Sequence, residues 1–193
     1  MNIIVKPYGS DLCYCRPDTT WERENRDLYS PDCVNAWNWT PVIFARISKA
    51  GKCISPKFAS RYYDSLNFGT LLYIGGADVA SGSCVDHTSI LPLPLFNPVV
   101  LETEGNKFEV VKNEKPIFSL EAPGVDCLQD GSPLLQAAEA AICKASQLTS
   151  LRIGDYVAVE LAPASVLAEK TEGSLSFKAT FCENEIFNFK IIF

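Results

Sequence analysis

Residues 12–31, LCYCRPDTTWERENRDLYSP, surround a single tryptophan, Trp21, with acidic, basic and hydroxyl side chains. A carboxylate such as that of Glu24 can take a proton from water, and an arginine can pair with an organic anion. A dense charged run is more often a solvated face of the protein. The stretch therefore raises the question of whether it forms the rim of an active site or the remains of one.

The chain has one histidine, His87, in the sequence SCVDHTS, so any mechanism that needs an imidazole must use it. Asp86 precedes it, but adjacent residues on a strand point to opposite faces, so a working pair of these two requires a turn. We expect a surface or capping histidine. Cys84 lies three residues earlier and can form a thiol–imidazole pair, but burial is the expectation because a reactive thiolate needs cationic surroundings.

Other catalytic and binding motifs are missing from the sequence. There is no G-x-S-x-G segment that would mark a serine nucleophile. The glycine-rich stretch YIGGADVASGS at 73–83 lacks the lysine and the helix pattern of a phosphate loop, so it predicts a flexible β-turn or lid. The eight cysteines lack the C-x-x-C spacing of a zinc ribbon, which predicts reduced thiols acting as small hydrophobic residues.

The composition is that of an ordinary globular protein, with 47% hydrophobic and 21% charged residues. A net charge of −6 without a basic stripe argues against binding to nucleic acid. The apolar run after Met1 and Asn2 is too short for a signal peptide or a membrane span, which predicts a cytoplasmic protein without membrane contact. The length of 193 residues predicts a single domain over 1–193.

Short stretches rich in branched and aromatic residues recur between turn residues, which predicts a β-rich chain. The predicted strands are 3–6, 42–46, 70–74, 98–102, 107–111, 116–120, 156–161, 174–181 and 186–193. The polar segment KNEK at 112–115 predicts a hairpin turn. Along 174–181, apolar residues at alternate positions (Leu175, Phe177, Ala179 and Phe181) predict one buried face.

One helix is predicted over 133–148, PLLQAAEAAICKASQL. Its apolar residues recur every 3.6 positions, and its many alanines allow close approach to a sheet. Ser132 is the expected N-cap, with Pro133 at the first helical position, where proline is best tolerated. The expected fold class is therefore mixed, mainly β with one principal α-helix.

Several of these segments occur in an order that resembles the fumarylacetoacetate hydrolase-like family. PVIFAR at 41–46 resembles the family's PVIFxKP strand, and LLYIGG at 71–76 resembles its strand ending in Ile-Gly. The helix then leads into SLRIGD at 150–155, which resembles TLxPGD. The resemblance spans about 12–193 and implies a β-roll architecture. The family's enzymes cleave, decarboxylate or isomerise acylpyruvate-like diketo acids with a divalent metal held by three carboxylates.

At the positions implied to bind metal, this sequence departs from the family. The resemblance places the first two ligands at Asn67 and Gly69, where the family has glutamates two residues apart. The third ligand, an aspartate, has no clean counterpart, and Asp86 beside His87 is the nearest candidate. The resemblance therefore implies Mg²⁺ or Mn²⁺ only if the protein is active, with Asn67, Asp86 and His87 as weak candidate ligands.

The family's general base is also incomplete here. In the family a segment resembling GRNYADHAKE carries a histidine and a glutamate that together deprotonate a water. The resemblance places Trp21 at the histidine position and Glu24 at the glutamate position, so Glu24 is the candidate catalytic residue. Arg16 keeps the arginine of the segment, and Arg46 stands where PVIFxKP has its lysine. Arg16, Trp21 and Arg46 are the implied substrate-binding residues.

Three functional interpretations remain open at this point. The first is a divergent fumarylacetoacetate hydrolase-like protein that has lost the metal and the general base and binds a small organic acid or acts noncatalytically. The second is an active hydrolase or lyase on a diketo acid, with a metal site rebuilt from Asp86, His87 and Glu22 or Glu24. The third is a β-rich interaction subunit that forms a homodimer through an exposed patch of Trp37, Trp39 and the phenylalanine-rich C-terminus.

Overall fold

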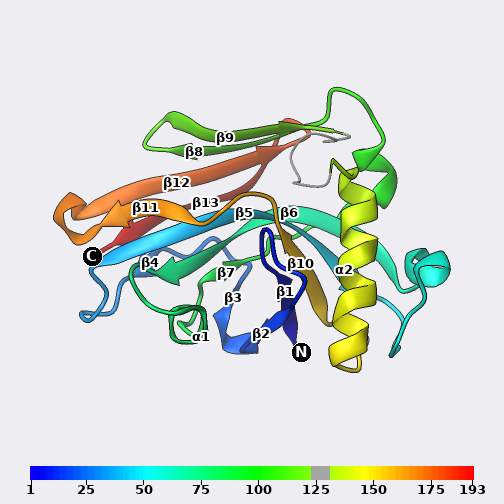
Figure 1. Ribbon diagram of the computed structural model, residues 1–193. Helices are drawn as coiled ribbons and strands as arrows, with labels where there is room; N and C mark the ends of the chain where they lie inside the picture. The colour runs from blue at the N-terminus through cyan, green and yellow to red at the C-terminus, as the bar shows by residue number, and fades with distance from the viewer. Residues whose placement is uncertain (123–130) are drawn as a thin grey trace.

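The computed structural model describes residues 1–122 and 131–193 and consists of two β-sheets and one long helix (Figure 1). The larger sheet has the strand order β2-β1-β10-β5-β6-β7-β3, and β11 pairs with β5. Its strands are β1 (Ile3–Lys6), β2 (Tyr14–Arg16), β3 (Trp21–Glu22), β5 (Ala36–Ile47), β6 (Tyr63–Ile74), β7 (Ser89–Ile90), β10 (Tyr156–Glu160) and β11 (Ser165–Glu169). The two edge strands, β2 and β3, are joined by residues 17–20, so this sheet curls into a roll.

The smaller sheet has the order β4-β13-β12-β8-β9 and packs over the larger one (Figure 1). Its strands are β4 (Leu28–Tyr29), β8 (Lys107–Lys112), β9 (Lys115–Glu121), β12 (Ser174–Phe181) and β13 (Asn184–Ile192). Helix α2 (Leu134–Leu148) lies beside both sheets. The remaining described helices are α1 (Val79–Gly82) and the 3₁₀ turns η1 (Asp18–Thr20), η2 (Pro56–Arg61), η3 (Pro98–Leu101) and η4 (Lys170–Glu172). Neither described α-helix has the length and hydropathy that a membrane crossing needs.

The alternation predicted for 174–181 is confirmed, and it builds the core between the sheets. Leu175, Phe177, Ala179 and Phe181 are all buried, whereas their neighbours face outward. Phe177 packs edge-on against Trp39 of β5, with ring centroids 5.6 Å apart. Period-two patterning therefore places β12 on the roll with one apolar face inward.

A second apolar cluster fills the inside of the roll. Its buried members are Ile3, Val5, Val42, Phe44, Leu71, Tyr73, Leu91, Tyr156 and Ala158. They alternate along each strand with residues that face the other sheet and α2, such as Ile4, Ile43 and Val157. The strands of the roll are therefore buried on both faces, which explains their nearly continuous apolar runs.

The hairpin predicted at 112–115 is confirmed, because β8 and β9 pair antiparallel with Lys112 opposite Lys115. Asn113 and Glu114 between them both have positive φ, 45° and 64°. A two-residue turn of this hand matches the right-handed twist of the strands that it joins. The main helix also occurs where it was predicted, but it begins at Leu134 with Pro133 as its N-cap, one residue later than the predicted Ser132 cap.

Two local predictions are wrong. The segment 98–102, predicted as a strand, contains η3, because the Asn97 side chain accepts a hydrogen bond from the Val99 N–H at 3.1 Å and Pro98 begins the turn. The glycine-rich stretch 73–83, predicted as a flexible turn or lid without a helix, contains the short helix α1, which Asp78 caps by accepting from Ser81 N–H at 3.0 Å.

Predictions about surface and buried residues also need correction. Trp37 and Trp39 are buried, so they do not form the exposed patch of the interaction-subunit hypothesis. Four cysteines predicted to act as small hydrophobic residues, including Cys84, for which burial was expected, are exposed. They are Cys15, Cys33, Cys53 and Cys84. Cys127 lies outside the described residues.

Candidate functional site

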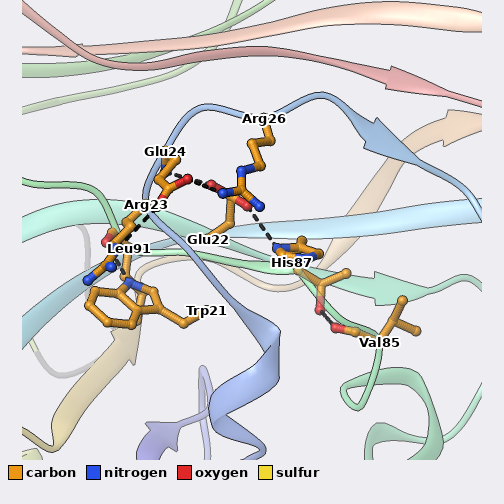
Figure 2. A network of polar contacts seen from close by, with 9 residues as sticks. Trp21, Glu22, Arg23, Glu24, Arg26, Val85, His87 and Leu91 are labelled. Carbon is orange, nitrogen blue, oxygen red and sulfur yellow. Dashed lines mark hydrogen bonds and ion pairs between the residues drawn. The ribbon is translucent and has the colours of Figure 1, made fainter.

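Strand β3 and the turn after it bring the charged stretch beside His87 (Figure 2). β3 pairs in parallel with β7, with Trp21 opposite Ser89 and Glu22 opposite Ile90. The turn that precedes β7 therefore lies next to β3. A cavity of about 240 Å³ opens there, lined by Trp21, Glu22, Arg23, Glu24, Arg26 and His87.

Glu22 and His87 form a carboxylate–imidazole pair in this cavity (Figure 2). The His87 Nδ1 atom lies 2.8 Å from Glu22 Oε2. The Glu22 side chain is 5% exposed, whereas that of His87 is 49% exposed. The other Glu22 oxygen, Oε1, accepts the backbone N–H of Glu24 at 2.6 Å, which fixes the carboxylate. With Nδ1–H donated to Glu22, the Nε2 atom of His87 carries the lone pair that can accept a proton.

Arg23 and Arg26 share the carboxylate of Glu24. Arg26 Nη2 forms a close ion pair with Glu24 Oε2, and Arg23 Nε lies 3.8 Å from Glu24 Oε1. All three side chains are about half exposed or more. Exposed ion pairs of this kind contribute only about 0–1 kcal/mol, so another carboxylate can take the place of the Glu24 carboxylate between the two guanidinium groups.

Trp21 closes the cavity toward the inside of the roll. Its Nε1–H donates to the carbonyl oxygen of Leu91 at 3.0 Å, and its ring packs against Tyr156 with centroids 5.3 Å apart. The guanidinium carbon of Arg23 lies 4.8 Å from the Trp21 ring centroid, within the range of a cation–π contact. Trp21 therefore anchors both the charged turn and the segment that follows β7.

Arg16 lies inside the roll rather than on the surface that Glu24 occupies. It is 2% exposed, and its Nη2 group donates to the Leu72 carbonyl at 2.9 Å and to Thr88 Oγ1 at 2.7 Å. The guanidinium carbon lies 5.0 Å from the ring centroid of Tyr73. These contacts join β2 to β6 and to the residue after His87, so Arg16 braces the turn that carries the imidazole.

A chain of buried hydroxyl and carboxyl groups also crosses the roll. Tyr73 O–H donates to Glu160 Oε1, and the Tyr14 hydroxyl lies 2.6 Å from that of Tyr73. Glu160 Oε2 accepts the Tyr8 backbone N–H at 2.9 Å. Burial raises the pKa of Glu160 above its usual value and raises the pKa of Tyr14 to about 12. The network thus holds both phenols as hydrogen-bonded, protonated groups inside the roll to a higher pH than an ordinary tyrosine.

Solved structures with the same chain fold were found, although no protein-family model and no curated protein sequence matches the chain. Fumarylpyruvate hydrolase from Pseudomonas aeruginosa, solved with Mn²⁺ and pyruvate, has 12% sequence identity and a TM-score of 0.76, and the match covers 100% of this chain and 89% of that one. Maleylpyruvate hydrolase from Sphingobium sp. SYK-6 has 11% identity and a TM-score of 0.74, with 99% and 70% covered. The chain has the fumarylacetoacetate hydrolase-like fold. The architecture that the sequence resemblance implied is therefore confirmed.

The sequence resemblance placed the family's first two metal ligands at Asn67 and Gly69 on β6, and both positions are closed off by the chain itself. Asn67 is fully buried, and its Nδ2 group donates to the carbonyl oxygens of Pro94 at 2.9 Å and Pro92 at 3.4 Å. A Cβ atom placed on Gly69 would lie 2.3 Å from the Ile90 carbonyl oxygen. Residues 90–94 therefore occupy the space over these two positions.

The residues present do not fit the fold family's divalent metal. The Asn67 Oδ1 atom already accepts the Phe68 N–H at 2.7 Å, and Gly69 offers no donor and no room for one. Among residues 1–122 and 131–193, no three His, Cys, Asp or Glu side chains are grouped so that they could hold a metal ion. A hard cation needs several oxygen ligands around one point, and this part of β6 does not supply them.

The structure places the other predicted residues as follows. Asp86 is exposed and lies in the turn before β7, which is the turn that a pair with His87 would require, but His87 bonds to Glu22 instead. Arg46 is exposed on β5, opposite Tyr156 of β10. Burial raises the pKa of Tyr156, and the charges of Arg46 and Arg23 oppose that shift, so both arginines lie near the same ring.

Sequence reasoning named Glu22 only as one option among several and did not single out Tyr14, Tyr73 or Glu160. Glu22 and His87 are 65 positions apart, and no spacing rule joins them. The available signal for Glu160 was a carboxylate inside the apolar strand YVAVEL, because a charged residue in a buried strand needs a partner.

Proposed function

We propose that this chain binds a small organic acid, without a divalent metal, in the cavity lined by residues 21–26 and His87. Residues 90–94 occupy the space over Asn67 and Gly69, and this observation supports binding without a metal ion. A fold that lacks its family's metal can still bind an acid where cationic side chains face a cavity.

The cavity offers the cations that an acid needs. Arg23 and Arg26 converge on one carboxylate, that of Glu24, and so mark a position where a carboxylate lies between two guanidinium groups. A ligand carboxylate would replace Glu24 there. Because the Glu24 pairs are solvent-exposed, their displacement costs little. Trp21 supplies a flat apolar wall beside this position.

Isothermal titration tests the proposal with acetate, pyruvate, Mn²⁺ and Mg²⁺ as separate titrants. Arg26→Gln should weaken acetate and pyruvate binding by up to about fivefold, since an exposed ion pair contributes about 0–1 kcal/mol. Arg152→Gln is the matched control, because Arg152 is an exposed arginine on the turn between α2 and β10. Tight stoichiometric Mn²⁺ binding, or equal acid affinity for wild type and Arg26→Gln, would contradict the proposal.

A second candidate function is an active hydrolase or lyase on a diketo acid, and the Glu22–His87 pair favours it. His87 Nε2 would take a proton from a water as the water oxygen bonds to a substrate carbonyl carbon, while Glu22 holds the ring in place. Cleavage of the adjacent carbon–carbon bond would then return that proton to the departing carbon.

Loss of ultraviolet absorbance of an acylpyruvate tests this second function. Glu22→Gln and His87→Asn should abolish turnover, whereas Arg152→Gln should retain it. Glu24→Gln separates the two candidates. It removes a competing carboxylate and should strengthen acid binding under the first, whereas the Glu22–His87 mechanism of the second does not use Glu24 and predicts unchanged turnover. Unchanged turnover in Glu22→Gln and His87→Asn would discard the second function.

A further inference from the structure

A second, larger cavity adjoins the first one. Its volume is about 660 Å³, compared with about 240 Å³ for the first. It is lined by Arg26, Asp27, Leu28, Tyr29, Pro31, Val85, Asp86 and His87. Arg26 and His87 line both cavities, so these two side chains stand where the cavities meet. A ligand held at the guanidinium groups can therefore extend past them into the larger space.

The larger cavity has an apolar wall that the fold presents to solvent. β4 pairs with the end of β13, with Leu28 opposite Ile191 and Tyr29 opposite Ile192. Successive side chains of a strand point to opposite faces, and Leu28 faces the core. Tyr29 consequently points outward and is 72% exposed. An exposed aromatic ring that lines a cavity beside a half-buried Val85 is suited to contact with an apolar ligand group.

The charges are distributed unequally between the two ends. In the first cavity Arg23 and Arg26 are balanced by the carboxylates of Glu22 and Glu24, whereas in the second one Arg26 stands against two carboxylates, those of Asp27 and Asp86. Asp27 is held in place, because its Oδ1 atom accepts the backbone N–H of Lys190 at 2.8 Å. A ligand with a second negative charge would bring it next to these carboxylates, where like charges repel.

From this geometry we infer that the bound acid is a monocarboxylate with an uncharged aromatic body. Its carboxylate replaces Glu24 between Arg23 and Arg26, and its ring lies against Tyr29 in the larger cavity. The inference rests on the proposed acid-binding function and specifies the ligand class for that same site. It excludes short dicarboxylates as the preferred ligands.

Isothermal titration of the full chain with four probes tests the inference: acetate, phenylacetate, succinate and the uncharged phenylacetamide. Burying one ring should make phenylacetate bind about tenfold more tightly than acetate, after part of the hydrophobic gain is lost to ordering of the ligand. Succinate should bind no more tightly than acetate. Phenylacetamide should bind at least about tenfold more weakly than phenylacetate, because it lacks the charge that pairs with the arginines.

Variants of Tyr29 test whether the aromatic ring of the ligand lies against this residue. Tyr29→Ala should remove the preference for phenylacetate over acetate and leave acetate affinity unchanged, whereas Tyr29→Phe should keep the preference. Ile153→Ala is the control, because Ile153 is also an exposed apolar residue but lies on the turn between α2 and β10. It should behave as the wild type. Circular dichroism of each variant verifies that the sheets remain folded.

The outcomes separate this inference from the function on which it rests. Acetate binding with no gain for phenylacetate, or tighter binding of succinate, would overturn the aromatic monocarboxylate and leave acid binding intact. A preference for phenylacetate that survives in Tyr29→Ala would overturn the placement of the ring. If neither acid binds, or if phenylacetamide binds as tightly as phenylacetate, the acid-binding function itself fails.

Discussion

Replacing Gly69 with alanine tests directly whether the segment that begins at Ile90 closes the position where the sequence resemblance placed a metal ligand. The added Cβ atom would lie 2.3 Å from the Ile90 carbonyl oxygen, whereas ordinary van der Waals contact begins at 3.4 Å. The β6 and β7 backbones must therefore move apart by about 1.1 Å. Both are backbone segments in a paired sheet, so the strain cannot be relieved by turning a side chain. A longer side chain at this position, such as that of glutamate, has the same Cβ atom and therefore clashes with the same Ile90 carbonyl oxygen.

The expected loss for Gly69→Ala is about 1–3 kcal/mol of the free energy of unfolding, the usual cost of overpacking a core. For a chain of this size each kcal/mol lowers the melting temperature by about 2–4 °C. Urea unfolding followed by tryptophan fluorescence measures the change, since Trp37 and Trp39 are buried in the native state. The control is Gly82→Ala, where a Cβ would be 3.4 Å from the nearest atoms. A Gly69→Ala variant as stable as wild type would show that the space over β6 is open.

Three further outcomes follow from the described contacts. Asn67→Ala should destabilise the protein by about 1–3 kcal/mol in urea unfolding, because the carbonyl oxygens of Pro92 and Pro94 lose their buried donor; no loss would mean that the amide does not hold this segment. Burial raises the pKa of Glu160 in the folded state, so its contribution to stability is present below the unfolded pKa of 4.5 and declines as the pH rises through the folded pKa. Glu160→Gln should therefore gain stability relative to wild type as the pH rises from acidic to neutral. Curves of unfolding free energy against pH that run parallel for the two proteins would contradict the shift. Phe177→Ala should cost about 3–5 kcal/mol in the same unfolding assay, because the ring is fully buried between the two sheets; a much smaller loss would place it outside the core.

Strand and helix positions followed from local patterns wherever one physical rule dominated. The alternation along 174–181 and the 3.6-residue period along 134–148 each predicted an element that the structure contains. The prediction failed at Pro98–Leu101, where β-branched residues favoured a strand but the Asn97–Pro98 capping signal determined the backbone. Side chains with strong β-propensity form a turn when a cap and a proline set the first dihedral angles.

The positions and partners of the polar residues of the site, in contrast, did not follow from local sequence patterns. Arg16, which was expected to line a ligand pocket, lies inside the roll, because the curl of the sheet places its guanidinium group against the Leu72 carbonyl and Thr88. A pair of Asp86 and His87 required a turn, and the structure has one at 85–87, with His87 at a φ of 61°, but this turn directs the imidazole to Glu22. Both outcomes depend on how distant strands pair, which no local spacing encodes.

The sequence by itself determined the composition of the site: it carries asparagine and glycine where the fold's relatives were expected to bind metal, one histidine, and a cluster of charges around Trp21. Those identities limit the chemistry because a missing carboxylate cannot be supplied by folding. Only the tertiary structure decided that residues 90–94 close over Asn67 and Gly69, and that Glu22 meets His87. The physical reason is that both contacts join segments far apart in the chain. Asn67 meets Pro92 and Pro94, 25 and 27 residues further on, and Glu22 meets His87, 65 residues further on, because β3 pairs in parallel with β7 once the sheet has curled into a roll.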